Sequence, residues 1–191
     1  MADYLVTAIY ENNNQKWQLS NLLVGPYSLF GKTAISYYNI ARSNYDKSYL
    51  IDAANTLQIA KECIRPAGNL FHFEKEKEFE EFYEKVTKEV QSKYQLPLSL
   101  ENIPTKPKIF NIFPQDINEG FFPMICYLSN IELYDSTSLA NENYKIRKEV
   151  DKIFNGININ KKYVFYRAYN EMPAKNRPVR YYGFTELGAA N

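Results

Sequence analysis

Few residues of this chain can carry covalent or acid-base chemistry. Its 191 residues include one histidine, two cysteines and seven glycines. Imidazole and thiol groups do much of the nucleophilic and general-base work in enzymes, and they are also common metal ligands. Cys63 and Cys126 are isolated among apolar neighbours, which is typical of reduced core residues rather than of a disulfide or a metal pair. We therefore expect no catalytic centre, no bound metal and no cofactor.

Long apolar runs are also missing. The longest covers the eight residues Phe121–Leu128 and is interrupted by Pro123, whereas a membrane-spanning helix needs roughly 20 apolar residues. The first residues, Met1–Val6, have neither a basic segment nor the apolar stretch of a secretory signal. These features predict a protein without a membrane partner, located in the cytoplasm, or in the virion if a phage encodes it.

Aromatic side chains are abundant instead. The chain has 17 tyrosines and 12 phenylalanines, and 45% of its residues are hydrophobic against 24% charged. This composition can close a substantial core, so residues 1–191 are expected to form a single domain. Because tyrosine and phenylalanine supply large contact areas, the same composition favours a protein that binds other proteins.

The apolar patterns predict an α+β fold, with a mainly helical core of about five helices and β-hairpins at the N- and C-termini. The expected parts are an N-terminal hairpin (1–24), helices (27–95), a proline-rich crossover (96–123), further helices (124–154) and a C-terminal hairpin (162–187). The expected strands are Tyr4–Tyr10, Lys16–Val24, Lys162–Asn170 and Pro178–Leu187. The expected helices are Tyr27–Ser43, Ser48–Ile64, Glu74–Tyr94, Phe122–Tyr134 and Ser138–Phe154.

The first two helices share a pattern of small residues. The stretch from Tyr37 to Ala41, with Ala53, Leu57, Ala60 and Pro66, resembles one tetratricopeptide helix pair, although no second copy follows. A lone helix hairpin packed through its alanines is the simpler interpretation.

The C-terminal hairpin holds the candidate interaction surface. Along its first strand Tyr163, Phe165, Arg167 and Tyr169 share one face, while Val164, Tyr166 and Ala168 share the other. Both faces are rich in large side chains, so one is expected to join the core and the other to meet a partner. The residues predicted to make this surface are Tyr163, Arg167, Tyr169, Arg177, Arg180 and Tyr182.

Positive charge is concentrated in the C-terminal hairpin and the segment before it. Between Lys145 and Arg180, ten basic residues stand against three acidic ones, although the whole chain has a net charge of only +1. Basic and aromatic side chains interleaved on a hairpin are suited to single-stranded nucleic acid. Nucleic acid is therefore a possible partner beside protein subunits.

Two segments contain residues of the kinds found in nucleotide-binding or catalytic sites. The stretch Gly25–Thr33 resembles a phosphate-binding P-loop, with Lys32 and Thr33 as its phosphate and magnesium residues, but its glycines are one residue too far apart and its loop is bulky. His72 lies between two phenylalanines, nine residues after Cys63. We expect it to be a hydrogen-bonded packing residue rather than half of a Cys-His dyad.

The sequence thus predicts a non-enzymatic building block of a larger protein assembly, such as a homo-oligomer or a ring or connector of a phage-like particle. Its expected contacts are the C-terminal hairpin and the turn at Asn12–Asn14. One alternative is a nucleic-acid-binding protein that uses the basic aromatic hairpin. Another is a nucleotide-using enzyme built on Gly25–Thr33.

Overall fold

The computed structural model describes residues 1–174 and 177–188. Their fold is α+β, with four α-helices and eight strands in two sheets, so it is less helical than expected. The elements in chain order are β1 (Ala2–Asn13), β2 (Lys16–Leu29), β3 (Lys32–Thr33), α1 (Ala34–Asp46), α2 (Leu50–Glu62), the 3-10 turn Gly68–Leu70, α3 (Glu76–Tyr94), β4 (Leu98–Ser99), β5 (Lys108–Ile117), β6 (Gly120–Leu128), α4 (Ser136–Ile153), β7 (Tyr163–Tyr169) and β8 (Tyr182–Leu187).

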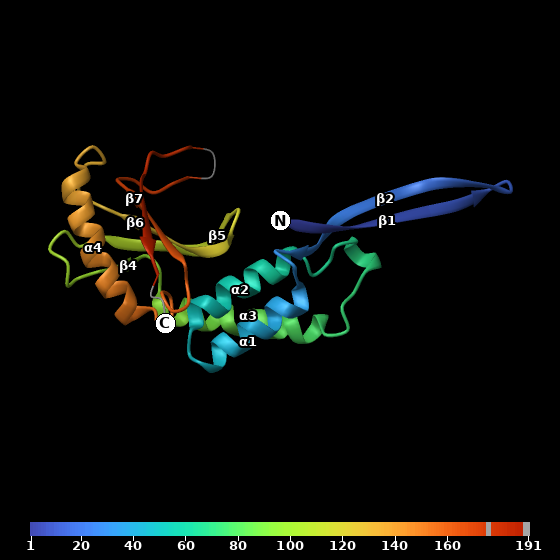
Figure 1. The fold of residues 1–191 in the computed structure, drawn as a ribbon, viewed down its shortest axis with the longest axis horizontal. Coiled ribbons are helices and arrows are strands. Elements are labelled where there is room, and N and C mark those ends of the chain that lie inside the picture. Colours follow the sequence, from blue (N-terminus) through green and yellow to red (C-terminus); the bar gives the residue numbers. More distant parts are fainter. Residues whose placement is uncertain (175–176, 189–191) are drawn as a thin grey trace.

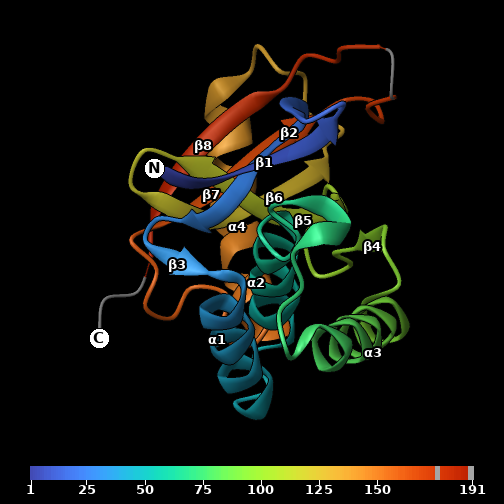
Figure 2. The ribbon, with the colours of Figure 1, turned by 90° about the vertical axis from the view of Figure 1, so that its right-hand side faces the viewer.

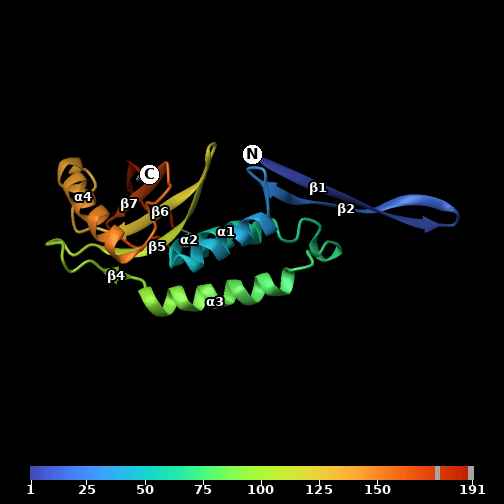
Figure 3. The ribbon, with the colours of Figure 1, turned by 60° about the horizontal axis from the view of Figure 1, so that its bottom comes forward.

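The molecule is elongated (Figures 1 and 3). The long hairpin of β1 and β2 projects from one end, α1, α2 and α3 form the middle, and the second sheet with α4 forms the other end. No helix in the described part of the chain is long and apolar enough to cross a membrane.

The N-terminal hairpin forms where it was predicted and is longer than expected. Asn14 and Gln15 both have positive φ angles, 51° and 64°, as a two-residue turn with the twist of the strands requires. The ladder continues to the pair Ala2–Leu29. The predicted helix at Tyr27–Ser43 therefore begins too early. Residues 27–29 belong to β2, and α1 begins only at Ala34, where the Thr33 side chain accepts a hydrogen bond from the Ser36 amide (3.4 Å).

The helix pair and the long amphipathic helix are confirmed. Ala41 of α1 and Ala53 and Ala60 of α2 are fully buried, as expected of small residues between two closely packed helices. The apolar face of α3 packs on this pair, with the Phe82 ring centroid 5.8 Å from that of Tyr38. Helices α1, α2 and α3 together form the helical layer.

The second sheet contains the main correction to the sequence prediction. Its strand order is β4-β5-β6-β7-β8, and only β6 and β7 run parallel, joined through α4. The proline-rich segment 96–123 contributes β4 and β5 and the start of β6, and the predicted helix Phe122–Tyr134 is a strand up to Leu128. Pro114 and Pro123 face each other in the β5–β6 ladder, beyond the parts of these strands that pair with β4 and β7. Proline is tolerated there because no neighbouring strand needs its missing N–H.

Helix α4 covers one face of this sheet (Figure 2). Ile125, Tyr127, Val164, Tyr166 and Ala168 lie on that face and belong to the same buried core as the helical layer. The C-terminal strands β7 and β8 are therefore part of a larger sheet rather than a separate hairpin. Residues 175 and 176, between the predicted strands Lys162–Asn170 and Pro178–Leu187, lie outside the described residues, as do residues 189–191.

Candidate interaction surfaces

The hairpin of β1 and β2, here called the arm, has one strongly apolar face. Residues directly opposite in an antiparallel ladder point to the same side, so the pairs Val6–Val24, Ala8–Leu22 and Tyr10–Leu19 lie on one face. A bulge at Ser20 keeps both Leu19 and Leu22 on that side. We call this surface the arm face. It consists of Tyr4, Val6, Ala8, Tyr10, Trp17, Leu19, Leu22 and Val24.

The arm face is exposed along its whole length. Its seven large apolar side chains have exposed fractions between 52% for Leu22 and 69% for Trp17. The opposite face is mixed: Glu11 lies there and its side chain shares a 2.7 Å hydrogen bond with Ser20, but Leu5, Ile9 and Leu23 lie on that side too and are half-buried. The two faces therefore differ in how far their apolar side chains are exposed, and the arm face has no partner within the described chain.

The base of the arm is fixed to the body. A Cβ added to Gly25 would lie 2.2 Å from the Pro66 carbonyl oxygen, so only glycine allows this close approach of β2 to the loop after α2. Tyr27 packs against Phe71 and Phe73 at centroid distances of 6.2 and 6.4 Å. These contacts hold the arm in its projecting position.

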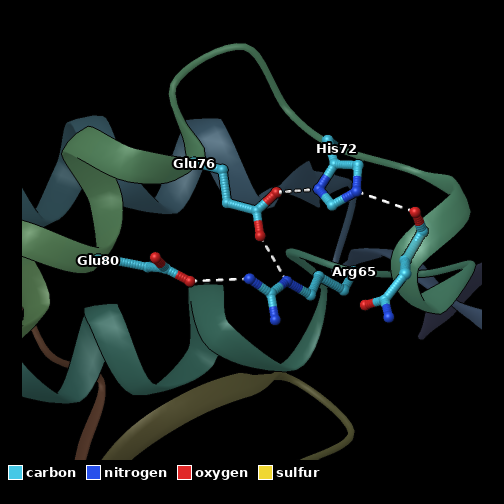
Figure 4. A network of polar contacts seen from close by, with 5 residues as sticks. Arg65, His72, Glu76 and Glu80 are labelled. Atoms are coloured by element: carbon cyan, nitrogen blue, oxygen red, sulfur yellow. Dashed lines mark hydrogen bonds and ion pairs between the residues drawn. The ribbon is translucent and has the colours of Figure 1, made fainter.

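The loop that receives the arm is itself held by polar contacts (Figure 4). His72 hydrogen-bonds through both ring nitrogens, to Glu76 Oε2 at 2.8 Å and to the Asn69 carbonyl oxygen at 2.9 Å. Arg65 pairs with Glu76 and, at 2.8 Å, with Glu80. The hydrogen bond with Glu76, helped by that with Asn69, raises the pKa of His72 above its ordinary value. Burial opposes the charge of Glu76, but its bonds with His72 and Arg65 keep its pKa below the ordinary value.

Neither cysteine has the environment of a nucleophile. Cys63 is fully buried and lies 3.6 Å from the Ala60 carbonyl oxygen, and burial raises the pKa of its thiol to about 11. Burial raises the pKa of Cys126 to about 11 as well. The described residues contain no group of three or more metal-ligating side chains.

The segment Gly25–Thr33 has the geometry of a hairpin rather than of a phosphate-binding loop. Residues 25–29 are extended in β2, Phe30 and Gly31 make a tight turn with φ angles of 50° and 70°, and Lys32 pairs with Leu29 in β3. The Thr33 hydroxyl caps α1. Lys32 and Thr33, the predicted phosphate and magnesium residues, thus take part in the β2–β3 pairing and in the cap of α1.

The six predicted surface residues of the C-terminal strands do not form one surface. Tyr163 and Arg167 lie on the sheet face away from α4, here called the open sheet face, where Phe122 packs 5.3 Å from Tyr163. Tyr169 is on the same side but buried, 5.5 Å from Phe110. Tyr182 faces the other way, opposite Ala168, and packs against the core.

Arg167 is already engaged on the open sheet face. Its guanidinium lies 4.6 Å from the Tyr181 ring centroid and donates a hydrogen bond to Gln115 Oε1 at 3.2 Å. Around it lies a small cluster built from residues of the sheet and Val179. This face is therefore mixed in character, with half-buried aromatic rings around a cation.

The remaining two predicted residues, Arg177 and Arg180, lie in the connection between β7 and β8. They line a shallow hollow of about 850 Å³ with Glu132, Tyr134 and Glu171. Arg177 contacts both carboxylate oxygens of Glu171, at 2.7 and 2.8 Å. Both arginines are exposed.

Much of the basic surplus between Lys145 and Arg180 is paired within the chain. Arg147 contacts Glu186 at 2.6 Å, Lys161 contacts Asp52 at 2.6 Å, and Lys162 pairs with Glu119. Such pairing reduces the positive field that would attract a nucleic-acid backbone. The sequence could not reveal these pairs, because their members lie far apart along the chain.

None of the eight residues of the arm face was among the predicted interaction residues, which on the arm covered only Asn12–Asn14 at its tip, where Asn12 and Asn13 belong to β1 and the turn is made by Asn14 and Gln15. The sequence contains no clear signal, because consecutive apolar residues such as Leu22, Leu23 and Val24 put apolar side chains on both sides of the strands, and such a pattern does not tell which side stays uncovered. Comparisons of the chain with protein-family models, curated proteins and solved structures found no match.

Proposed function

We propose that this protein is a non-enzymatic building block that assembles with other subunits through the arm face. The observation that carries the proposal is the row of seven large apolar side chains, each more than half exposed, on an arm that stands away from the body. Together they present on the order of 700 Å² of surface, taking roughly 150–250 Å² for a fully exposed aromatic residue and an area near the lower figure for valine and leucine. Monomeric proteins rarely leave a continuous apolar patch of more than a few hundred Å² in water.

The arrangement of the chain supports an assembly role. The base of the arm is anchored through Gly25 and Tyr27, so the arm face cannot fold back onto the core without breaking those contacts. A homo-oligomer, or the ring or connector piece expected from the composition, would bury this face between subunits.

The test is the native mass, measured by size exclusion with light scattering and with the absorbance ratio at 260 and 280 nm recorded along the peak. We expect an oligomer of the 22.4 kDa chain that is free of nucleic acid. Leu22→Arg should reduce the mass to that of the monomer, whereas Asn21→Arg, on the opposite face of the arm, should not. A wild-type protein that stays monomeric at all concentrations would contradict the proposal.

Nucleic-acid binding is the second candidate, supported by Arg167 stacked on Tyr181 among the aromatic rings of the open sheet face. The measurement is the fluorescence anisotropy of a labelled single-stranded oligonucleotide at low and high salt. Salt-sensitive binding that is lost when Arg167, Arg177 and Arg180 are replaced by alanine, with the native mass unchanged, would favour this candidate over assembly.

A further inference from the structure

We infer that the occupant of the arm face is the arm face of a second copy, so that two arms pack face to face about a two-fold axis. This inference rests on the proposed assembly function and specifies its geometry. The dimer would contain a two-layer β-structure made of β1 and β2 from each copy, with the two bodies outside it.

The shape and chemistry of the arm face restrict what can cover it. Strands of 12 and 14 residues make an arm on the order of 40 Å long. Its apolar row contains no charged side chain. The surface that matches it is another extended apolar sheet face, because two sheets pack at a spacing of about 10 Å with their side chains interdigitated.

Within the described chain, the arm face is itself the best match. The other exposed large apolar residues are dispersed over separate elements, for example Ile40 in α1, Leu70 in the 3-10 turn and Tyr144 in α4. The open sheet face is apolar in part, but an arm placed on it would cover the Arg167 guanidinium. Taking a charge out of water without a carboxylate partner is costly.

The area also agrees with a dimer. Two arm faces of on the order of 700 Å² each would bury a total close to the ~1,600 Å² of a standard specific interface. A two-fold contact uses the same patch on both copies, so no patch is left exposed once two chains have bound. Two-fold symmetry is also the commonest symmetry of soluble oligomers. A single apolar face per chain is all that such a contact needs.

The symmetry makes a positional prediction. Ala8 and Leu22 are paired near the midpoint of the arm. If the two arms overlap along their whole length, Ala8 faces Ala8 of the other copy when the arms run antiparallel, and faces Leu22 of the other copy when they run parallel. In both arrangements the two Ala8 residues lie at the same height of the interface and at most about one strand spacing apart sideways.

A thiol cross-linking experiment tests this directly in the full-length chain. Both natural cysteines are buried, so Ala8→Cys adds one accessible thiol on the arm face, and Asn21→Cys adds one at the same height on the opposite face. With a short bis-maleimide, we expect Ala8→Cys to give more covalent dimer than Asn21→Cys by on the order of tenfold or more, because pairing raises the local concentration of the thiols. Adding Leu22→Arg to Ala8→Cys should remove this advantage.

Other results separate the inference from the proposed function. An oligomeric mass with equally weak cross-linking of Ala8→Cys and Asn21→Cys would overturn the arm-on-arm arrangement and leave assembly intact. Cross-linking of Ala8→Cys to Thr185→Cys, which lies on the open sheet face opposite Phe165, would overturn it in favour of a head-to-tail contact. A monomeric wild-type protein would overturn both.

Discussion

Lys161, in the loop before β7, and Asp52 of α2 form a partly buried ion pair that joins this loop to the helical layer. The Lys161 Nζ atom lies 2.6 Å from Asp52 Oδ2, across 109 residues of sequence, and the two side chains are 23% and 5% exposed. Lys161→Met would keep most of the aliphatic stem and leave the carboxylate of Asp52 buried without its cation. We expect this substitution to be strongly destabilising.

The size of the effect follows from the burial of the pair. Removing one partner of a buried ion pair costs about 3–5 kcal/mol, and because Lys161 keeps some contact with water we expect a loss near the lower figure, about 3 kcal/mol. For a chain of this length that corresponds to a fall in melting temperature of roughly 6–12 °C. The neighbouring pair of Lys162 with Glu119, whose side chains are 58% and 48% exposed, provides the matched control: Lys162→Met should cost far less, because water screens an exposed pair.

The pH dependence has a definite sign. Burial raises the folded pKa of Asp52 above 3.8, and Lys161 opposes that rise. A raised pKa contributes stability that is present below the unfolded pKa and is lost as pH increases through the folded pKa. Without Lys161 the folded pKa rises further, so the loss caused by Lys161→Met should be largest at neutral pH and should shrink towards pH 3.8.

Thermal and urea unfolding at several pH values measure both effects. The double variant Asp52→Asn with Lys161→Met should recover much of the lost stability, because no unpaired charge remains. The reasoning would be refuted if Lys161→Met cost no more than Lys162→Met at neutral pH, or if its cost grew as the pH was lowered.

Three further predictions concern buried or hydrogen-bonded groups. Both carboxylate oxygens of Glu142 in α4 are buried without a hydrogen-bond partner among the described residues, so Glu142→Leu should raise the free energy of unfolding, by about 1–3 kcal/mol, in urea titrations; an unchanged or lower value would contradict this. Because the pKa of His72 is raised by its bond with Glu76, its stabilising contribution should be complete below the unfolded pKa and be lost as pH rises through the folded pKa. His72→Ala should therefore lower the melting temperature more at mildly acidic than at alkaline pH, and a pH-independent difference would count against the bond. Cys63 and Cys126, with pKa values raised to about 11, should react with a thiol reagent far faster in denaturant than in the native protein; fast labelling of both thiols in the native state would contradict their burial.

Segments with a clear local period were predicted well. The apolar positions of α3 recur at helical spacing over nineteen residues, and the asparagine-rich turn gave the N-terminal hairpin its position. The run Phe121–Leu128 was misjudged because, apart from Pro123, no residue in it separates an apolar from a polar side, and such a run has neither the period of a strand nor that of a helix. Its hairpin partner β5 directly precedes it in the chain, but β7, which pairs with its other edge, follows only after α4.

The sequence by itself determined three properties of the protein. They are the α+β class, the scarcity of catalytic side chains, and the position of those elements whose apolar residues recur with a single helical or strand period. Tertiary structure alone decided which of two similar faces is covered. Tyr166 and Tyr163 lie on opposite faces of one strand, and both faces carry large aromatic side chains, yet Tyr166 is 1% exposed beneath α4 while Tyr163 lies on the open sheet face. The arm is the clearest case, because both sides of β1 carry apolar residues in the sequence, and nothing in the pattern tells which side stays uncovered. Burial is a property of the elements that pack together, and those are set by contacts between residues far apart along the chain.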